Sequence, residues 1–405
     1  MRQENPLESP PESSPESPLE TQPENSPVPD DLDAVYRSQP EEVLPVGVGG
    51  PLPQLRSVPE PQPQPVSEPL PAELPAAVVA APAAPEPAAP APPAPTPVPV
   101  LGNPAHSGTR PPTYPPRPGR LLSARDDLDA AVLPDLVVDG ATHGALTVRA
   151  ASVRGDSHRW EREPRQDALC VTLLGGGAPH DTLLLLAVAD GVGSAQRSHI
   201  GSNTACRMIA GLLDPCAEQL VHAVRDGADT TLTALVSSAV GRTAEALDRL
   251  AAERGEQPSA FSTTLRALLV PVDPEIRGRG FFAVGDGGLA VLRGGEVWDL
   301  DPLGESGATD GATDGVIDTR TAALPTARHA EARVLGPAAP GDVYVLSTDG
   351  LSSPLAGEQE MRDFLRAAWG SGTVPGPVDF LWQTQFRAKS YDDDRTVVCL
   401  WEETA

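Results

Sequence analysis

The pattern of apolar and polar residues changes near residue 121. From there on, short apolar runs alternate with longer stretches in which apolar residues recur every three or four positions. The short runs predict strands, and the spacing of three to four predicts helices. The predicted strands are 145–155, 167–174, 182–189, 262–270, 281–284, 289–292, 297–300, 343–348 and 395–401. The predicted helices are 200–213, 230–254, 358–369 and 377–389.

The order of these elements predicts an α+β layered fold. Most strands follow one another as hairpins, and two adjacent helices are inserted after the third strand. A doubly wound parallel sheet would need a long helix between every pair of strands, and the pattern lacks them. Residues 301–320 contain Ala-Thr-Asp-Gly twice, and this polar, glycine-rich composition predicts a mobile loop.

Residues 1–118 show almost no periodic apolar pattern. They hold 34 of the 48 prolines but only two aromatic residues, Tyr36 and Tyr114. Such a segment cannot bury enough apolar surface to offset the loss of chain entropy. We therefore predict a disordered tail over 1–120, with local polyproline II character, and one folded domain over 121–405 whose core spans about 145–402.

Charge and cysteine usage limit the classes of partner. The net charge is −26 and Lys389 is the single lysine. Phosphate-backbone binding needs clustered Lys and Arg, so we expect no nucleic-acid partner. The four cysteines lack the CxxC spacing of a zinc ribbon or thioredoxin-type site. No signal peptide is visible and the longest apolar run is too short to cross a bilayer, so we expect a cytoplasmic monomer with no membrane partner.

Four aspartates lie in tight turns next to predicted strands. They are Asp190 after 183–189, Asp286 after 281–285, Asp349 after 343–348, and Asp393 before 396–401. Carboxylates gathered at strand ends would repel one another and take up protons unless a cation lies among them. Hard divalent cations relieve that repulsion. The pattern therefore indicates a binuclear metal centre and an enzyme, although each aspartate alone could be an ordinary turn or helix-cap residue.

Taken in order, these segments resemble the metal-dependent protein phosphatase family, the PP2C-type serine/threonine phosphatases. The resemblance covers about residues 145–402. It rests on six short motifs in the order of the family: Arg162-Glu-Pro-Arg-Gln-Asp-Ala168, Ala189-Asp-Gly-Val-Gly193, Phe261-Ser-Thr-Thr264, Val284-Gly-Asp286, Gly341-Asp-Val-Tyr-Val-Leu-Ser-Thr-Asp-Gly350 and Asp393-Asp-Arg-Thr-Val-Val398.

The resemblance implies a four-layer α-β-β-α sandwich of two antiparallel sheets, with metals in a cleft at one edge. It also implies roles for single residues. Asp190 would bridge two metals, and the Gly191 carbonyl would bind one of them. Asp349 and Asp393 would complete the shell of the first metal, and Asp286 would share a weakly held third metal with Asp349. Asp167 would act through water, and Arg162 would bind the phosphate.

The function implied is hydrolysis of phosphoserine and phosphothreonine in proteins. In this family a water bridging two divalent metals attacks the phosphorus, so the catalytic residues would be Asp190, Asp349 and Asp167. Oxygen ligands with several waters fit Mn²⁺ or Mg²⁺. The substrate would be a phosphorylated protein, the product of a Ser/Thr kinase. His158 or another histidine could protonate the leaving alkoxide.

The sequence also departs from the family pattern. Gly287-Gly288 replaces the usual Ser-Arg, and Asp394 stands where Asn is usual. The segment after Asp190 lacks the second glycine of the common form, and His158, Arg159 and Arg165 lie close enough to take over the role of Arg162. These departures are typical of a divergent bacterial branch.

Two alternatives to a protein phosphatase remain open on the sequence. One is a catalytically weak pseudophosphatase or scaffold of the same fold, and the other is a phosphatase of small phosphate esters. The proline-rich tail predicts a polyproline-binding partner, with an inert spacer as the alternative.

Overall fold

The computed structural model of the protein describes residues 112–114, 121–299, 322–388 and 390–402. All of them belong to one compact unit that begins at Pro93. The predicted loop at 301–320 and nearly all of the predicted tail lie outside the described residues, so both stay predictions.

The described strands form two antiparallel sheets. The six-stranded sheet has the order β1-β2-β11-β10-β7-β8, and the five-stranded sheet has the order β3-β4-β5-β6-β9. The strands are β1 (Leu136–His143), β2 (Leu146–Val153), β3 (Ala168–Leu174), β4 (Leu183–Ala189), β5 (Leu265–Pro271), β6 (Arg279–Val284), β7 (Gly288–Arg293), β8 (Glu296–Asp299), β9 (Glu331–Leu335), β10 (Val343–Ser347) and β11 (Arg395–Glu402).

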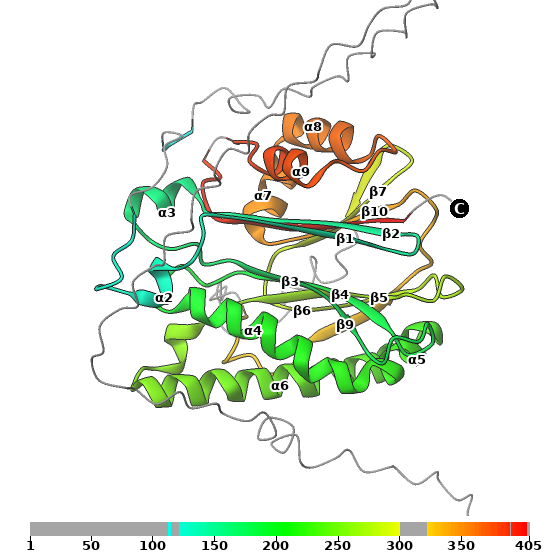
Figure 1. Ribbon diagram of the computed structural model, residues 1–405, viewed down its shortest axis with the longest axis horizontal. Helices are drawn as coiled ribbons and strands as arrows, with labels where there is room; N and C mark the ends of the chain where they lie inside the picture. The colour runs from blue at the N-terminus through cyan, green and yellow to red at the C-terminus, as the bar shows by residue number, and fades with distance from the viewer. Residues whose placement is uncertain (1–111, 115–120, 300–321, 389, 403–405) are drawn as a thin grey trace, which may run out of the picture. The chain divides into compact units, whose positions relative to one another are not determined.

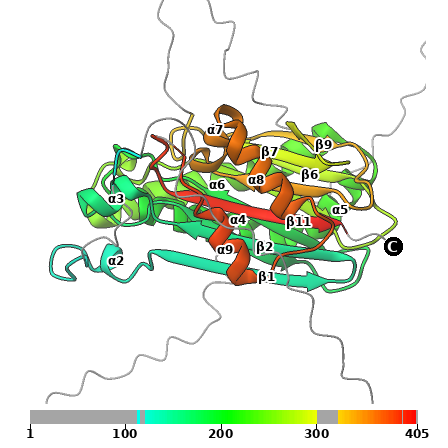
Figure 2. The ribbon, with the colours of Figure 1, turned by 90° about the horizontal axis from the view of Figure 1, so that it is seen from above.

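Helices cover the outer face of each sheet (Figure 1). In Figure 1, α4 and α6 lie along the five-stranded sheet, and Figure 2 shows α7, α8 and α9 lying across the six-stranded sheet. The helices are α2 (Leu128–Ala131), α3 (Asp156–Glu161), α4 (Ser198–Leu213), α5 (Ala217–Arg225), α6 (Asp229–Arg254), α7 (Asp349–Gly357), α8 (Gln359–Trp369) and α9 (Pro377–Thr384).

The sequence of strand β4 is apolar without interruption because the strand is buried on both faces. Leu184, Leu186 and Val188 pack into the core between the two sheets, against residues of β10 and β11. Leu183 and Leu185 point the other way, into the core beneath α4 and α6. A strand buried on both faces needs apolar side chains at every position. Burial of each leucine contributes about 2 kcal/mol, so this strand is a main anchor of the layered fold.

The predicted α+β class with two antiparallel sheets is confirmed, and the apolar strands and long helices lie where the pattern predicts them. Six described helices and strands were not predicted: β1, α2, α3, α5, α7 and β9. The sequence signal of β1 is weak because its side chains are nearly all exposed, and α7 carries Pro354 in its interior. The predicted helix 377–389 was too long, because α9 ends at Thr384. Within the described residues, no helix has both the length and the apolar character needed to span a bilayer.

Candidate metal centre

Asp190 directly follows β4, and its backbone is held from both sides. Its N–H donates to Thr264 Oγ1 (2.9 Å), while its carbonyl accepts from Thr264 N (2.8 Å) and from Thr263 Oγ1 (2.9 Å). These bonds give a structural role to the Phe261–Thr264 motif and fix the point where the chain leaves the sheet. A Cβ on Gly191 would lie 2.7 Å from Ser198 Cβ, so this position needs glycine. The metal-binding role of the Gly191 carbonyl stays a prediction.

Asp349 is the first residue of α7 and follows β10 after a single residue, Thr348. The start of α7 is pressed against the start of β11: a Cβ on Gly350 would lie 1.8 Å from the carbonyl oxygen of Asp394. β10 and β11 are paired neighbours, so this close packing sets the distance between the segments that carry Asp349 and Asp393.

Replacement of Gly350 by alanine should therefore destabilise the domain strongly. Relief of the clash must move α7 away from β11, and overpacking of this kind costs about 2 kcal/mol or more. Urea unfolding of the full-length protein measures this cost. Gly211→Ala is the matched control, because a Cβ there meets nothing within 4 Å and alanine favours a helix. Equal stability of the Gly350→Ala variant and the wild type would refute this packing argument.

Asp286 and Asp393 are the two exposed members of the group. Asp286 lies in the turn between β6 and β7, flanked by Gly285 (φ 87°) and Gly287 (φ 126°), both in the left-handed region that favours glycine. Asp393 lies just before β11, with its side chain 56% exposed. Because these two carboxylates are exposed, solvent can reach the otherwise largely buried group of aspartates from their side.

The structure brings the predicted aspartates together. Burial raises the pKa of Asp190 well above its usual value, and the charges of Asp167, Asp349 and Asp393 raise it further. Burial likewise raises the pKa of Asp349, followed by the charges of Asp286 and Asp393. The carboxyl of Asp190 therefore interacts with those of both Asp167 and Asp349. Carboxylates that crowd in this way favour a proton or a metal ion between them.

Asp167 is the most deeply buried carboxylate of the group, with 1% exposure just before β3. Its Oδ2 accepts a hydrogen bond from Thr348 Oγ1 (2.8 Å). Among the described residues, its Oδ1 has no hydrogen-bond partner. Burial, and then the charge of Asp394, raise the pKa of Asp167 to about 8. A buried carboxylate oxygen that lacks a hydrogen-bond partner, close to Asp190, is typical of a site that binds a cation or a water molecule bound to that cation.

Asp394 has a structural role that the sequence did not reveal. Its two oxygens accept hydrogen bonds from Gly155 N (2.6 Å), His158 Nδ1 (2.9 Å), Asp167 N (3.2 Å) and Gln166 N. Asp394 thereby joins the start of α3, the loop before β3 and the start of β11. In the family that the sequence resembles, Asn is usual at this position. The only hint in the sequence is the run of three aspartates, 392–394.

His158, Asp393 and Asp394 form a second compact group, with potential ligand atoms within 4.8 Å of one another. Their chemistry argues against a metal site there. Although burial lowers the pKa of His158, hydrogen bonding to Asp394 and the nearby carboxylates outweigh it and raise the pKa to about 9. A protonated imidazole is no ligand. Since the Asp394 oxygens are occupied by N–H donors, only Asp393 of this group is available to a metal.

Arg162 caps the C-terminal end of α3 in the left-handed conformation (φ 68°). Its side chain is exposed, and among the described residues its guanidinium has no ion pair or hydrogen bond. The three alternatives named above are engaged. Arg159 pairs with Asp135 and Asp156, buried Arg165 donates to Ser152 Oγ and the Asp167 carbonyl, and His158 pairs with Asp394. Arg162 is thus the member of this segment best able to bind an anion.

Comparison with known proteins gives a family match over most of the described domain. The family model "Protein phosphatase 2C" matches residues 154–380, which is more than half of the chain and includes all the candidate residues except Asp393. A comparison with curated protein sequences gives no match.

Three solved structures illustrate the structural likeness. A serine/threonine phosphatase from S. agalactiae is 15% identical with a TM-score of 0.45, over 64% of this chain and 100% of that one. The Mycobacterium tuberculosis phosphatase PstP/Ppp is 21% identical with a TM-score of 0.40, over 66% and 100%. The catalytic domain of PstP in complex with two manganese ions is 22% identical with a TM-score of 0.38, over 65% and 98%.

On the sequence alone, the six motifs were expected to belong to one family. The family match covers five of them completely, and the sixth, 393–398, lies beyond its end. The two sheets carry these motifs to one edge of the sandwich, where their aspartates interact. The chain therefore belongs to the protein phosphatase 2C family.

Proposed function

We propose that this domain is a metal-dependent protein phosphatase that hydrolyses phosphoserine and phosphothreonine. One observation supports the proposal above all others. Asp190, Asp349, Asp393 and Asp286, from four separate segments, form one interacting group of carboxylates, and Asp190 also interacts with the buried Asp167. Such a group is costly for the fold unless it binds cations.

The donor set fits Mn²⁺ or Mg²⁺. It consists of carboxylates, with no cysteine and no available histidine, and hard oxygen donors suit these two ions better than Zn²⁺. When bound, such ions would neutralise charge on the transferring phosphoryl group and acidify a water to act as nucleophile. Asp190, Asp349 and Asp393 would hold the two ions, with the Gly191 carbonyl as a further ligand. Asp286 and Asp349 would hold a third, weaker one.

The remaining residues would position the reacting groups. Arg162, exposed and unpaired among the described residues, would bind the phosphate oxygens of the substrate. Asp167 would hold an ordered water through its free Oδ1, since Thr348 fixes the other oxygen. Water held in this way approaches the phosphorus from a defined direction, which lowers the entropic part of the barrier.

Hydrolysis assays on the full-length protein test the proposal. We expect turnover of phosphothreonine and phosphoserine peptides and of p-nitrophenyl phosphate with Mn²⁺ or Mg²⁺, and none with EDTA. Activity that persists in the presence of EDTA would contradict the metal-dependent mechanism. Hydrolysis of p-nitrophenyl phosphate without any phosphopeptide turnover would favour a phosphatase of small esters. Inactivity with both substrates at saturating Mn²⁺ would favour a pseudophosphatase or scaffold.

Deletion of residues 1–118 should leave turnover of p-nitrophenyl phosphate within about twofold of wild type. The candidate residues all lie between 162 and 393, and a tail without a core contributes little to a preformed site. Steady-state kinetics of the two proteins at the same Mn²⁺ concentration measure the effect. A much larger loss, or a shortened protein that precipitates, would mean that the tail is part of the folded domain.

A further inference from the structure

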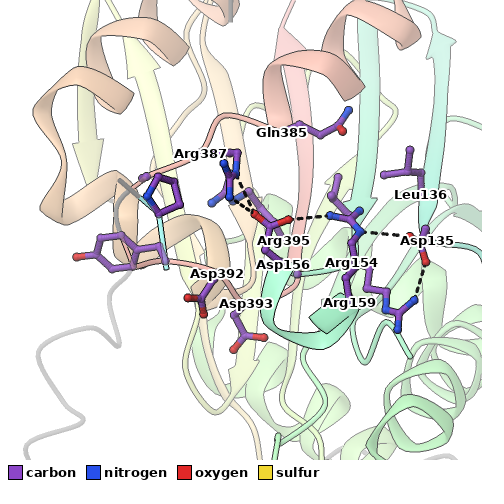
Figure 3. Close-up of a pocket in the computed structure, with 15 residues that line it drawn as sticks. Asp135, Leu136, Arg154, Asp156, Arg159, Gln385, Arg387, Asp392, Asp393 and Arg395 are labelled. Carbon is purple, nitrogen blue, oxygen red and sulfur yellow. Dashed lines mark hydrogen bonds and ion pairs between the residues drawn. The ribbon is translucent and has the colours of Figure 1, made fainter. Parts of the chain in front are cut away.

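A pocket lies beside the metal centre. Its volume is about 310 Å³, and its walls come from the end of β2, from α3 and from the segment between α9 and β11. Asp393 lies on its rim, so the pocket and the metal centre share an edge (Figure 3). None of the proposed roles in phosphate hydrolysis accounts for this pocket.

Five charged side chains of the pocket form a continuous chain of ion pairs (Figure 3). Arg387 binds Asp156 through Nε (2.9 Å) and Nη2 (2.8 Å), and Arg159 links Asp156 (3.3 Å) to Asp135 (3.2 Å). Arg154 forms the last ion pair of the series, also with Asp135 (2.9 Å). Because these arginines are already neutralised by carboxylates, the pocket does not fit a second phosphate group. A neutral ligand with hydrogen-bond acceptors fits it better.

One such ligand is already in place, and it comes from the chain itself. The Tyr114 carbonyl accepts a hydrogen bond from Arg387 Nη2 (2.5 Å), and Pro112 lines the pocket. The Tyr114 ring lies against Trp160 of α3, with ring centroids 6.1 Å apart. Trp160 is still 63% exposed, so this surface could accept more of the same segment.

The sequence of this segment suits such a surface. Residues 111–118 read Pro-Pro-Thr-Tyr-Pro-Pro-Arg-Pro. Proline-rich chain adopts polyproline II conformation, in which carbonyl groups form no internal hydrogen bonds and are free to accept from outside. Known binding sites for such segments combine an aromatic surface with a few polar donors. Here Trp160 supplies the aromatic surface and Arg387, held by Asp156, supplies the donor.

We propose that Trp160, Arg387 and Asp156 form a docking site for the proline-rich segment centred on Pro112–Tyr114 of the same chain. This contact would tether the tail beside the metal centre. The inference does not rest on phosphatase activity, because it concerns binding alone.

Photo-crosslinking within the full-length protein tests the docking site. The photoreactive residue p-benzoylphenylalanine replaces Tyr114, which keeps an aromatic ring and the backbone carbonyl. It replaces Tyr36, the other tail tyrosine, in a control protein. We expect crosslinks from position 114 within the same chain, to peptides that contain Trp160 or residues 385–391, and at least fivefold less of these from position 36.

Two further substitutions make the test specific. Trp160→Ala should lower the crosslink yield about fivefold, which is the scale of one lost ring contact. Trp382→Ala, which removes another exposed tryptophan, on α9, should leave the yield unchanged. Both side chains are more than half exposed, so neither variant should unfold, and thermal melting checks this. Equal yields in the Trp160→Ala variant and the parent protein would overturn the proposal, as would crosslinks formed mainly between two chains.

Discussion

Replacement of Asp190 by asparagine should lower kcat for phosphate hydrolysis by at least about 100-fold while the protein stays folded. Asparagine keeps the shape and removes the negative charge at the position where two metals would be bridged. Loss of supporting residues around a metal already costs about 10- to 100-fold, so loss of a bridging ligand should cost at least as much. Asp349→Asn should behave similarly.

The control for this prediction is Asp286→Asn. Asp286 is exposed and would serve a weaker third metal, so the loss of activity should be smaller. The stability of the Asp190→Asn variant distinguishes the loss of a metal ligand from damage to the fold. The pKa of Asp190 is raised because its charge is unfavourable in the metal-free protein, so the neutral variant should be at least as stable without metal. Wild-type turnover of Asp190→Asn at saturating Mn²⁺ would show that the metal centre is wrongly assigned.

The second large effect concerns stability. Mn²⁺ should raise the melting temperature of the wild-type protein by about 5 °C, because a ligand at 100 times its Kd stabilises by about 2.7 kcal/mol and a domain of this size gains about 2 °C per kcal/mol. Asp190→Asn should show little shift under the same conditions. Differential scanning calorimetry with Mn²⁺ and with EDTA measures both proteins. Equal shifts would place the bound metal somewhere other than Asp190.

The pH dependence of the metal-free protein follows from the same carboxylates. The pKa of Asp167 is raised to about 8 in the folded state, against a usual value of 3.8, so the folded protein binds its proton more tightly than the unfolded chain does. This contribution to stability is full below about pH 4 and is lost as the pH rises through about 8. Without metal, the protein should therefore lose stability from this group between pH 4 and 8, and Mn²⁺ should reduce the loss.

Much of the fold could be predicted from the sequence because its core strands are apolar without interruption. β4 and the helix pair α4 and α6 carry strong periodic signals, since each buries a broad apolar surface. β1 and β9 are edge strands of the two sheets. The exposed side chains of β1 leave no alternation to read, and β9 is only five residues long.

The candidate centre was predictable only in part, for a related reason. The aspartates at strand ends are visible as turn motifs, and their order in the chain indicates the family. The residues that position them give no such signal. Thr348, which fixes Asp167, and Asp394, which joins three segments, act through contacts between residues more than 150 positions apart. Pairings of this range depend on strand order, which local patterns do not encode.

Anomalous X-ray scattering at the manganese edge, from crystals of the full-length protein soaked in Mn²⁺, tests the central claim most directly. We predict two strong peaks bridged by the Asp190 carboxylate, with Asp349 and Asp393 among the remaining ligands, and a loss of both peaks in Asp190→Asn. A weaker third peak would lie between Asp286 and Asp349. A peak at His158 and Asp394 instead, or none near Asp190 at saturating Mn²⁺, would contradict the assignment of this group of aspartates as the metal centre.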